Sequence, residues 1–194
     1  IREAKFGGVA KKIDPAPNGH ERLTMRAARP GFDWPPIWLC LAFLVQNVEE
    51  VAGGGPPVPR FLEKWFGPLA AQTSVTAAIL ISLAGIAVTV AAARANPPKL
   101  AMFAQTAFAA GLAANALIQL ALSLSERAIL PGTISGVLLM LPFALLVLVR
   151  MAAPSMIGSK GTMIAAFAGL GAMPLVLAAT WILAAVLMRA LGAA

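Results

Sequence analysis

Charged residues and cysteine are scarce in this sequence, and each scarcity excludes a class of protein. Charged residues make up 12% of the 194 residues and hydrophobic residues make up 59%, whereas about a quarter of a typical soluble domain is charged. The composition excludes an ordinary soluble domain and indicates a protein embedded in a membrane. The single cysteine, Cys40, excludes a disulfide within the chain, and its apolar surroundings predict that it packs as a small hydrophobe.

Histidine is also nearly absent, because the only one, His20, lies in the polar region before the first apolar segment. No histidine is therefore available inside a membrane segment to bind a haem, a chlorophyll or a zinc ion, and we predict no cofactor and no metal. No nucleophile–base pair and no glycine-rich phosphate loop stands out, so no residue is assigned a catalytic role. The net charge of +7 lies in the N-terminal region and the connecting loops. Anionic lipid and membrane topology explain it better there than nucleic acid does.

Long apolar segments are what the sequence does contain. A helix that crosses the hydrocarbon core of a bilayer needs about 20 mostly apolar residues. We therefore expect an all-α, polytopic transmembrane bundle over residues 34–194, preceded by a basic, polar cytoplasmic tail over residues 1–33. Its helices, about five, are expected at residues 35–51, 69–93, 100–124, 131–149 and 163–188. Pro142 and Pro174 fall inside the last two and predict kinks, which membrane helices tolerate.

The loop after the first predicted helix contains a shorter apolar feature. Residues 59–66 mix charged side chains with large apolar ones, among them Trp65 and Phe66. Such a mixture is typical of a short helix lying in the membrane interface. A solvent-exposed loop with chance aromatic residues is the alternative.

Lysine and arginine are divided unevenly between the two sides of the predicted bundle. Eleven lie on the side of the N-terminal tail and four on the other side, which together account for the 15 in the chain. Cytoplasmic loops carry the excess of these residues in membrane proteins. We therefore expect a multi-pass protein of the bacterial inner membrane with its N-terminus in the cytoplasm and its C-terminus in the periplasm.

A polar cluster interrupts the end of the first predicted helix, over Gln46-Asn47-Val48-Glu49-Glu50. In a helix, Gln46 shares a face with Glu49 and Glu50, which follow it by three and four residues. Helix length places Glu49 in the outer third of the bilayer, where a carboxylate costs a few kcal/mol unless it meets water or a polar partner. We expect both acids to lie within the membrane; the alternative is that the helix ends early and leaves them solvated.

The third predicted helix supplies a partner for this cluster. Asn115 and Gln119 are four residues apart and therefore lie on one face. Their depth in the membrane is expected to be similar to that of the two acids, so all six polar residues are predicted to form one intramembrane site. Glu126 and Arg127 follow at the outer mouth of the helix, where we expect an ion pair.

These motifs resemble the HXXEE-motif family of small bacterial membrane proteins over about residues 34–150. The family has a His-x-x-Glu-Glu pattern in its first helix, then an Asn-Ala-x-x-His segment, an Arg-x-x-x-Pro-Gly turn and a leucine-rich helix. In this chain Glu49 and Glu50 match the paired acids, Asn115 matches the asparagine, and Pro131-Gly132 matches the turn.

Both histidine positions of the pattern depart from it, because Gln46 and Gln119 stand there. The resemblance implies a site of two histidines and two glutamates that would suit a divalent metal. Glutamine is a poor ligand for zinc or iron. The chain is therefore interpreted as a degenerate copy that retains the scaffold of the family without metal chemistry.

Three functions are compatible with these features. The first is a non-catalytic accessory subunit of a larger inner-membrane complex, such as a respiratory or photosynthetic one, with other membrane-protein subunits and lipids as partners. It is favoured by the missing histidines and by alanine- and glycine-rich helices whose backbones can approach a neighbour closely. The second is a small membrane enzyme that uses Glu49 or Glu50 as an acid or base. A transporter ranks third, because no inverted repeat or pair of broken helices is evident.

Overall fold

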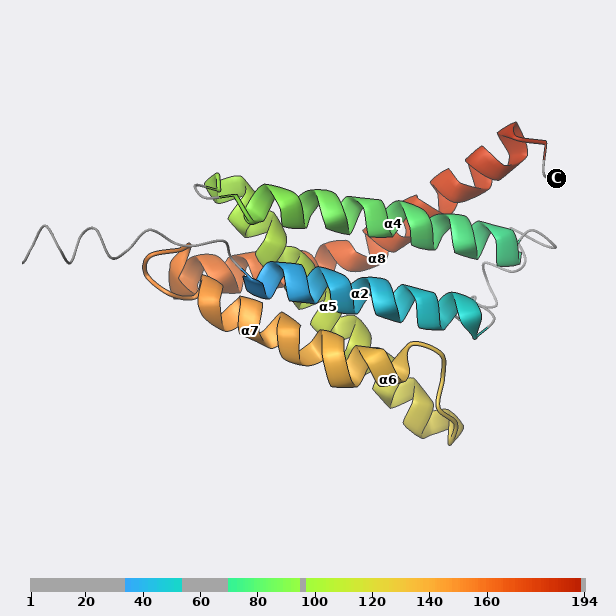
Figure 1. Cartoon of the computed structure of the whole chain (residues 1–194), viewed down its shortest axis with the longest axis horizontal. Coiled ribbons are helices and arrows are strands. Elements are labelled where there is room, and N and C mark those ends of the chain that lie inside the picture. The colour runs from blue at the N-terminus through green and yellow to red at the C-terminus, as the bar shows by residue number, and fades with distance from the viewer. Residues whose placement is uncertain (1–33, 54–69, 95–96, 193–194) are drawn as a thin grey trace, which may run out of the picture. The chain divides into compact units, whose positions relative to one another are not determined.

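The computed structural model describes residues 34–53, 70–94 and 97–192 (Figure 1). Every regular element within these ranges is helical: α2 (Trp34–Ala52), α4 (Ala70–Ala92), α5 (Lys99–Glu126), α6 (Thr133–Ser135), the π-helical turn η2 (Gly136–Met140), α7 (Leu141–Met151) and α8 (Gly158–Ala190). Because α6, η2 and α7 follow one another without a break, the described chain forms five long helical segments. The expected all-α bundle is confirmed. The predicted interfacial helix at 59–66 and the tail at 1–33 lie outside the described residues.

Four of the described segments are long and apolar enough to cross a membrane: Gln72–Ala92, Lys99–Glu126, Thr133–Met151 and Gly158–Ala190. The chain is therefore a membrane protein. α2 has 19 residues but falls outside this set, because its last third contains two amides and two carboxylates. Hydropathy alone thus supports four of the five predicted spans.

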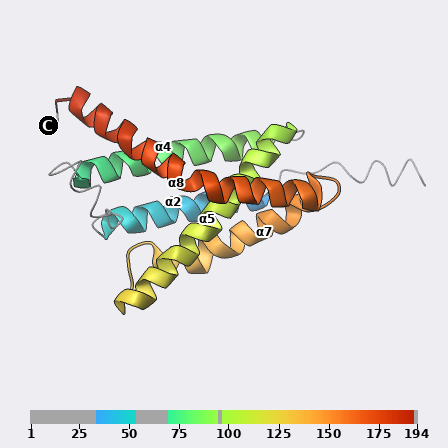
Figure 2. The ribbon, with the colours of Figure 1, turned by 180° about the vertical axis from the view of Figure 1, so that it is seen from behind.

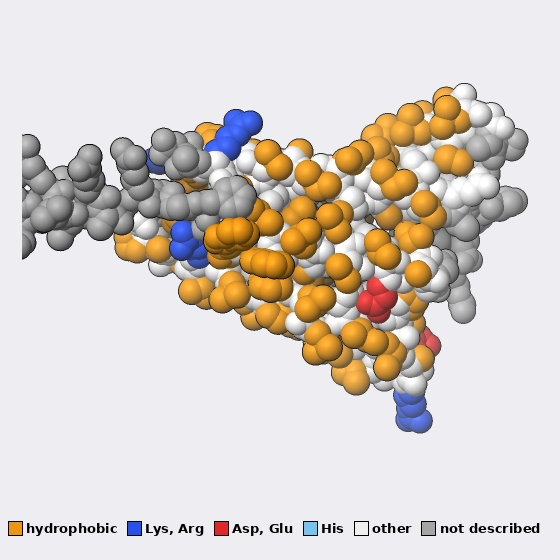
Figure 3. Space-filling view, viewed as in Figure 1, with side chains coloured by type: hydrophobic (Ala, Val, Ile, Leu, Met, Phe, Trp, Pro, Cys, Tyr) orange, Lys and Arg blue, Asp and Glu red, His pale blue; other side chains and the backbone are white. Residues whose placement is uncertain are grey.

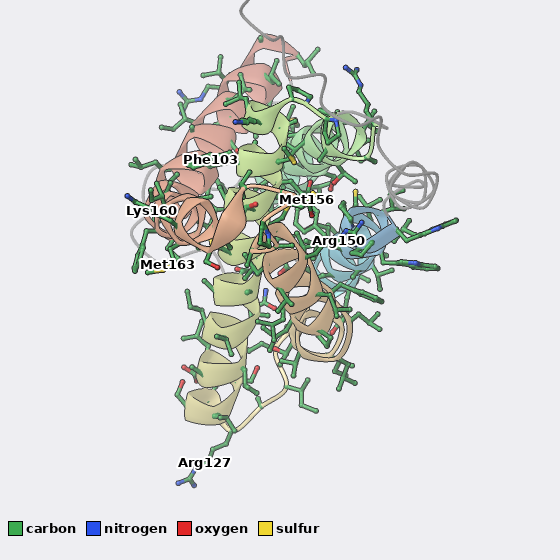
Figure 4. The ribbon with its side chains drawn as sticks, turned by 90° about the vertical axis from the view of Figure 1, so that its left-hand side faces the viewer. Phe103, Arg127, Arg150, Met156, Lys160 and Met163 are labelled. Atoms are coloured by element: carbon green, nitrogen blue, oxygen red, sulfur yellow. The ribbon has the colours of Figure 1, made fainter. Side chains whose placement is uncertain are left out.

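The last helix begins at Gly158, five residues before the predicted start at Met163. Gly158 takes a positive φ of 71°, which makes the turn into the helix. The helix then continues through polar residues such as Lys160, which lies at the end of the bundle (Figure 4). The prediction was wrong here because it equated the helix with its apolar stretch, whereas a membrane helix can extend beyond the hydrocarbon layer.

α5 is the central helix of the bundle and packs against α2, α4, α7 and α8. Successive long segments run in opposite directions, so that α2 begins at the end of the bundle where α4 finishes (Figure 1). A single hydrophobic cluster joins α2, α5 and the η2–α7 segment, and its buried members are Leu39, Ala42, Phe43, Met102, Ala109, Leu112, Ala113, Ala116, Met140, Ala144, Val147 and Met151. The molecular surface drawn in Figure 3 is largely hydrophobic, and its Lys and Arg side chains lie near the ends of the bundle.

α5 and α8 cross at a point where their backbones touch. A methyl group on Gly169 of α8 would overlap the carbonyl oxygen of Ala107 in α5. One on Gly111 would lie 3.7 Å from the Gly169 oxygen. Glycine at such positions permits the close approach that membrane helices use in place of hydrophobic driving force. Beyond the crossing the two helices diverge (Figure 2).

Both helices with internal proline are irregular. α8 changes direction along its length (Figures 1 and 2) and contains Pro174, the residue type that most often causes such bends. Pro142 lies in the first turn of α7, directly after η2. A π-helical turn shifts the hydrogen-bond pattern, and so η2 accommodates the donor that Pro142 lacks.

Candidate functional site

The amide side chains of Gln46 and Gln119 converge on one oxygen of Glu50. Gln46, one turn earlier in α2, donates from Nε2 to Glu50 Oε1 at 2.8 Å. Gln119 of α5 donates from Nε2 to the same oxygen. Gln46 is 1% exposed and Glu50 is 8% exposed, so these amides replace water as the donors that a buried carboxyl group requires. We call these three residues the Glu50 cluster.

Glu49 points to a different neighbour, the beginning of α6. Its Oε2 accepts a hydrogen bond from the backbone N–H of Ser135 at 3.0 Å, and the amides of Gly132 and Ile134 also face this carboxylate. The first amides of a helix have no partner within the helix, and they attract negative charge. Gly132 is the N-cap of α6 and has no side chain to cap it. Glu49 therefore supplies from α2 the acceptor that the cap residue lacks.

The turn before α6 is shaped to receive the end of α2. Gly132 has a φ of 84°, a conformation that glycine adopts without cost. A Cβ atom on Gly132 would lie 2.6 Å from Glu50 Cγ and 2.8 Å from its Oε1. One on Gly53 would overlap the ring of Pro131. The end of α2 and the Pro131-Gly132 turn are thus in direct contact, and both glutamates meet this turn.

The two remaining residues of the predicted polar cluster, Asn47 and Asn115, have different surroundings. Asn47 donates from Nδ2 to Ser82 Oγ of α4 at 2.8 Å, and Ser82 in turn donates to the Ala78 carbonyl at 2.7 Å. Asn115 lies on the same side of α5 as Gln119 and lines a cavity. Of the six residues predicted to form one site, the structure brings Gln46, Glu50 and Gln119 together, whereas Glu49 and Asn47 contact other helices.

The expected ion pair at the mouth of α5 is absent from the part of the chain that the structure describes. Glu126 and Arg127 are both exposed. Arg127 is the C-cap of α5 with a φ of 52°, and its amide bonds back to the last turn of the helix. Its side chain points away from the bundle (Figure 4). The prediction failed because consecutive residues at a helix end diverge, so their side chains do not face each other.

Several residues of the site were missed by the sequence interpretation. Ser82 and Ser135 carry no charge, and hydroxyl residues are common in membrane helices for packing alone. Gly132 was noted only as part of the Pro131-Gly132 turn, without its contact to Glu50. Ser123 and Thr133 also join α5 to α6 through a hydroxyl–hydroxyl contact of 2.7 Å. The one available signal was Pro131-Gly132 directly before an apolar helix, which marks a helix start without a capping side chain.

A cavity of about 430 Å³ opens beside the Glu50 cluster. It lies between α4, α5 and α8, in the region where α5 and α8 diverge, with α2 at its base (Figure 2). Its lining is mostly apolar, and its polar residues are Asn47, Glu50, Ser74, Asn115, Gln119 and Thr180. The cluster is therefore placed between a tightly packed helix junction on one side and an apolar cavity on the other.

The arrangement is suited to hydrogen bonding rather than to metal binding. Glu50 Oε1 already receives two N–H donors, which occupy the lone pairs of that oxygen. No group of three or more His, Cys, Asp or Glu residues that could hold a metal ion occurs among the described residues. Glu50 can accept further hydrogen bonds only through its other oxygen, Oε2.

The fold and the site define the class of this molecule: a polytopic helical membrane protein whose paired glutamates connect the end of one helix to two others. Within that class, the chain belongs to the family of proteins of unknown function with an HXXEE motif, whose model matches residues 37–147. The motif falls at positions 46, 49 and 50, so that glutamine replaces its histidine. No curated protein and no solved structure matches the chain.

Proposed function

We propose that the chain is a non-catalytic accessory subunit of a larger protein complex in the bacterial inner membrane. The observation that carries this proposal is the use of both motif carboxylates as connections between helices. Glu49 accepts the Ser135 amide at the start of α6, and Glu50 accepts amide donors from α2 and α5. A general base must have an accessible lone pair and a partner that orients it. The contacts of Glu49 and of Glu50 Oε1 serve packing instead.

A second observation concerns Gly171, on α8. Unlike Gly169, two residues earlier, Gly171 has no atom within 4 Å of the position that a Cβ would take. Contacts within the described chain therefore give no reason for glycine at this position. Small residues on an outer helix face permit close packing of another membrane helix. A neighbouring subunit that packs on this face of α8 would explain the residue.

Co-purification tests the subunit proposal. An affinity-tagged chain, extracted from its native membranes in a mild detergent, is expected to migrate with a defined set of other membrane proteins on a native gel. Replacement of Gly171 by Leu is expected to reduce their recovery at least several-fold. Val176→Leu, at another exposed position of α8, is the matched control and is expected to leave recovery unchanged. A chain that elutes alone, with no partner after cross-linking in the membrane, would refute the proposal.

The proposed orientation has the N-terminus in the cytoplasm, with α2 as a fifth span. At the end of the bundle where α2 begins, the described residues include Arg94, Lys99, Arg150 and Lys160, and an excess of such residues is typical of the cytoplasmic side. A cysteine introduced at Gly55 is expected to react with a membrane-impermeant maleimide added to the periplasmic side. A cysteine introduced at Asn96 is expected to react only after the membrane is opened. The reverse pattern would overturn the orientation.

A membrane enzyme remains the second candidate, because Glu50 lines the cavity as well as the helix junction. In that case Glu50→Gln should abolish activity toward a molecule bound there, yet leave the fold intact because glutamine keeps an acceptor oxygen. The subunit proposal predicts instead that Glu50→Gln leaves the function of the complex nearly unchanged when the subunit still assembles.

A further inference from the structure

The cavity next to the Glu50 cluster has walls and a base of different chemistry. Leu112, Ile118 and Leu122 of α5 face Leu177 and Trp181 of α8 across it. The volume of about 430 Å³ falls in the range of about 300–1,000 Å³ that is usual for small-molecule sites. The walls alone could be filled by an acyl chain of the surrounding lipid.

The base of the cavity offers hydrogen-bonding groups that an acyl chain cannot satisfy. The bonds from Gln46 and Gln119 both end on Glu50 Oε1, and no described residue donates to Glu50 Oε2. Asn115 lines the same cavity as Glu50, and its side-chain amide forms no hydrogen bond with the described residues. A polar group that lines an apolar cavity loses hydrogen bonds to water unless a bound molecule replaces them.

We propose that this cavity binds an amphiphilic small molecule with an apolar body and a hydrogen-bond-donating head group. The head donates to Glu50 Oε2 and exchanges hydrogen bonds with Asn115, while the apolar body lies between α5 and α8. The close crossing at Gly111 and Gly169, together with the bend of α8 around Pro174, holds the two helices apart beyond the crossing and keeps the cavity open. This inference is independent of the subunit proposal, since a subunit or a free protein could bind such a molecule.

Bromine quenching of Trp181, which lines the cavity, provides the test. The full-length chain is placed in phosphatidylcholine nanodiscs and titrated with an undecanol that carries bromine at its tail end. The control probe is the methyl ether of the same alcohol, which has the same body and accepts hydrogen bonds but donates none. The signal from Trp181 is obtained by comparing the chain with its Trp181→Phe variant.

The alcohol is expected to quench Trp181 saturably. It should reach half-saturation at a mole fraction about tenfold lower than that of the ether, as one additional well-formed hydrogen bond provides. Asn115→Leu is expected to reduce this preference about threefold. Because Asn115 has no hydrogen bond to lose within the described chain, this variant should still fold, and native-gel migration checks that it does.

Two alanines of α8 give a matched pair for the position of the ligand. Ala178 lines the cavity and Ala179 is exposed without lining it. Ala178→Phe is expected to abolish saturable quenching by filling the cavity, whereas Ala179→Phe is expected to leave it intact. Equal half-saturation for alcohol and ether would show that only an acyl chain or lipid occupies the cavity, and would overturn the proposal. Equal behaviour of the two phenylalanine variants would overturn the assigned location.

Discussion

The two faces of the last turn of α2 carry adjacent carboxylates that perform different tasks. On the face toward α6, Glu49 accepts backbone amides at a helix start, a contact that any acceptor of the right length could provide. On the face toward α5 and the cavity, Glu50 accepts two side-chain amides while buried in apolar surroundings. The comparison teaches that a pair of identical residues in a motif need not form one site. Glu49 joins α2 to α6, and Glu50 places a hydrogen-bonded carboxyl group in the apolar interior.

Gly132 packs against Glu50 and its amide faces Glu49, so its substitution is expected to have the largest effect. A methyl group at a φ of 84° is strained, and at 2.6 Å from Glu50 Cγ it would displace that side chain. Gly132→Ala is expected to lower the free energy of unfolding by about 2–4 kcal/mol, from backbone strain together with disrupted hydrogen bonds. Unfolding by SDS in mixed micelles measures this change.

Gly171→Ala is the matched control for Gly132→Ala, because nothing lies within 4 Å of its Cβ position. It is expected to be neutral or slightly stabilising, since alanine favours a helix over glycine. Equal losses for the two glycines would mean that the contact between the turn and Glu50 does not contribute to stability.

The next largest effect is expected on the interior face. Glu50→Leu removes the acceptor from two amide groups, and each unpaired donor costs about 1–3 kcal/mol. Because neighbouring polar groups in a membrane find other partners, we expect a total loss of about 2 kcal/mol. Glu50→Gln keeps one acceptor oxygen and is expected to lose less than half as much. The same SDS titration measures both losses of stability, and the loss should be larger for Glu50→Leu than for Glu50→Gln. A Leu variant that is more stable than the Gln variant would contradict this expectation.

A smaller effect is expected on the face toward α6. Loss of a helix-capping acceptor costs about 1 kcal/mol, so Glu49→Leu is expected to destabilise the protein by that amount. Glu49→Gln retains an oxygen at the same position and is expected to be tolerated. Hydrogen exchange at the Ser135 amide gives a local readout: it should accelerate in the Leu variant and stay slow in the Gln variant. If exchange at Ser135 is the same in all three proteins, Glu49 does not cap α6.

The sequence predicted the helices well and the site only in part, for physical reasons. Length and hydropathy determine where a membrane helix forms, and helical periodicity correctly placed Gln46 beside Glu50. The contact with Gln119 followed from similar depth on two helices, α2 and α5, that run in the same direction. The role of Glu49 could not be predicted, because it depends on the rotation of α2 relative to α6 and on the backbone of the Gly132 turn. The cavity could not be predicted either, since it results from the crossing angle of α5 and α8.

The smallest change in stability, and the sharpest test of the comparison, is expected when both glutamines of the Glu50 cluster are replaced by the histidines of the family pattern. An imidazole N–H can donate to Glu50 Oε1 as the amides of Gln46 and Gln119 do, so the double variant Gln46→His/Gln119→His should differ from the parent by less than about 1 kcal/mol without metal. When metal is present, the stability of the double variant should differ strongly from that of the parent. Two neutral imidazoles and one carboxylate that converge from α2 and α5 form a three-ligand set that suits zinc or cobalt.

Cobalt gives a visible d–d spectrum that reports its coordination, and zinc should raise the stability of the double variant in proportion to its occupancy. The parent chain and each single variant are the controls, and they should show neither effect, because two ligands or fewer hold these metals weakly. Removing Glu50 from the double variant should abolish binding, whereas Glu49→Gln should leave it unchanged if the two glutamates act separately. If binding instead requires Glu49 and not Glu50, the division of tasks between the two faces of α2 is wrong.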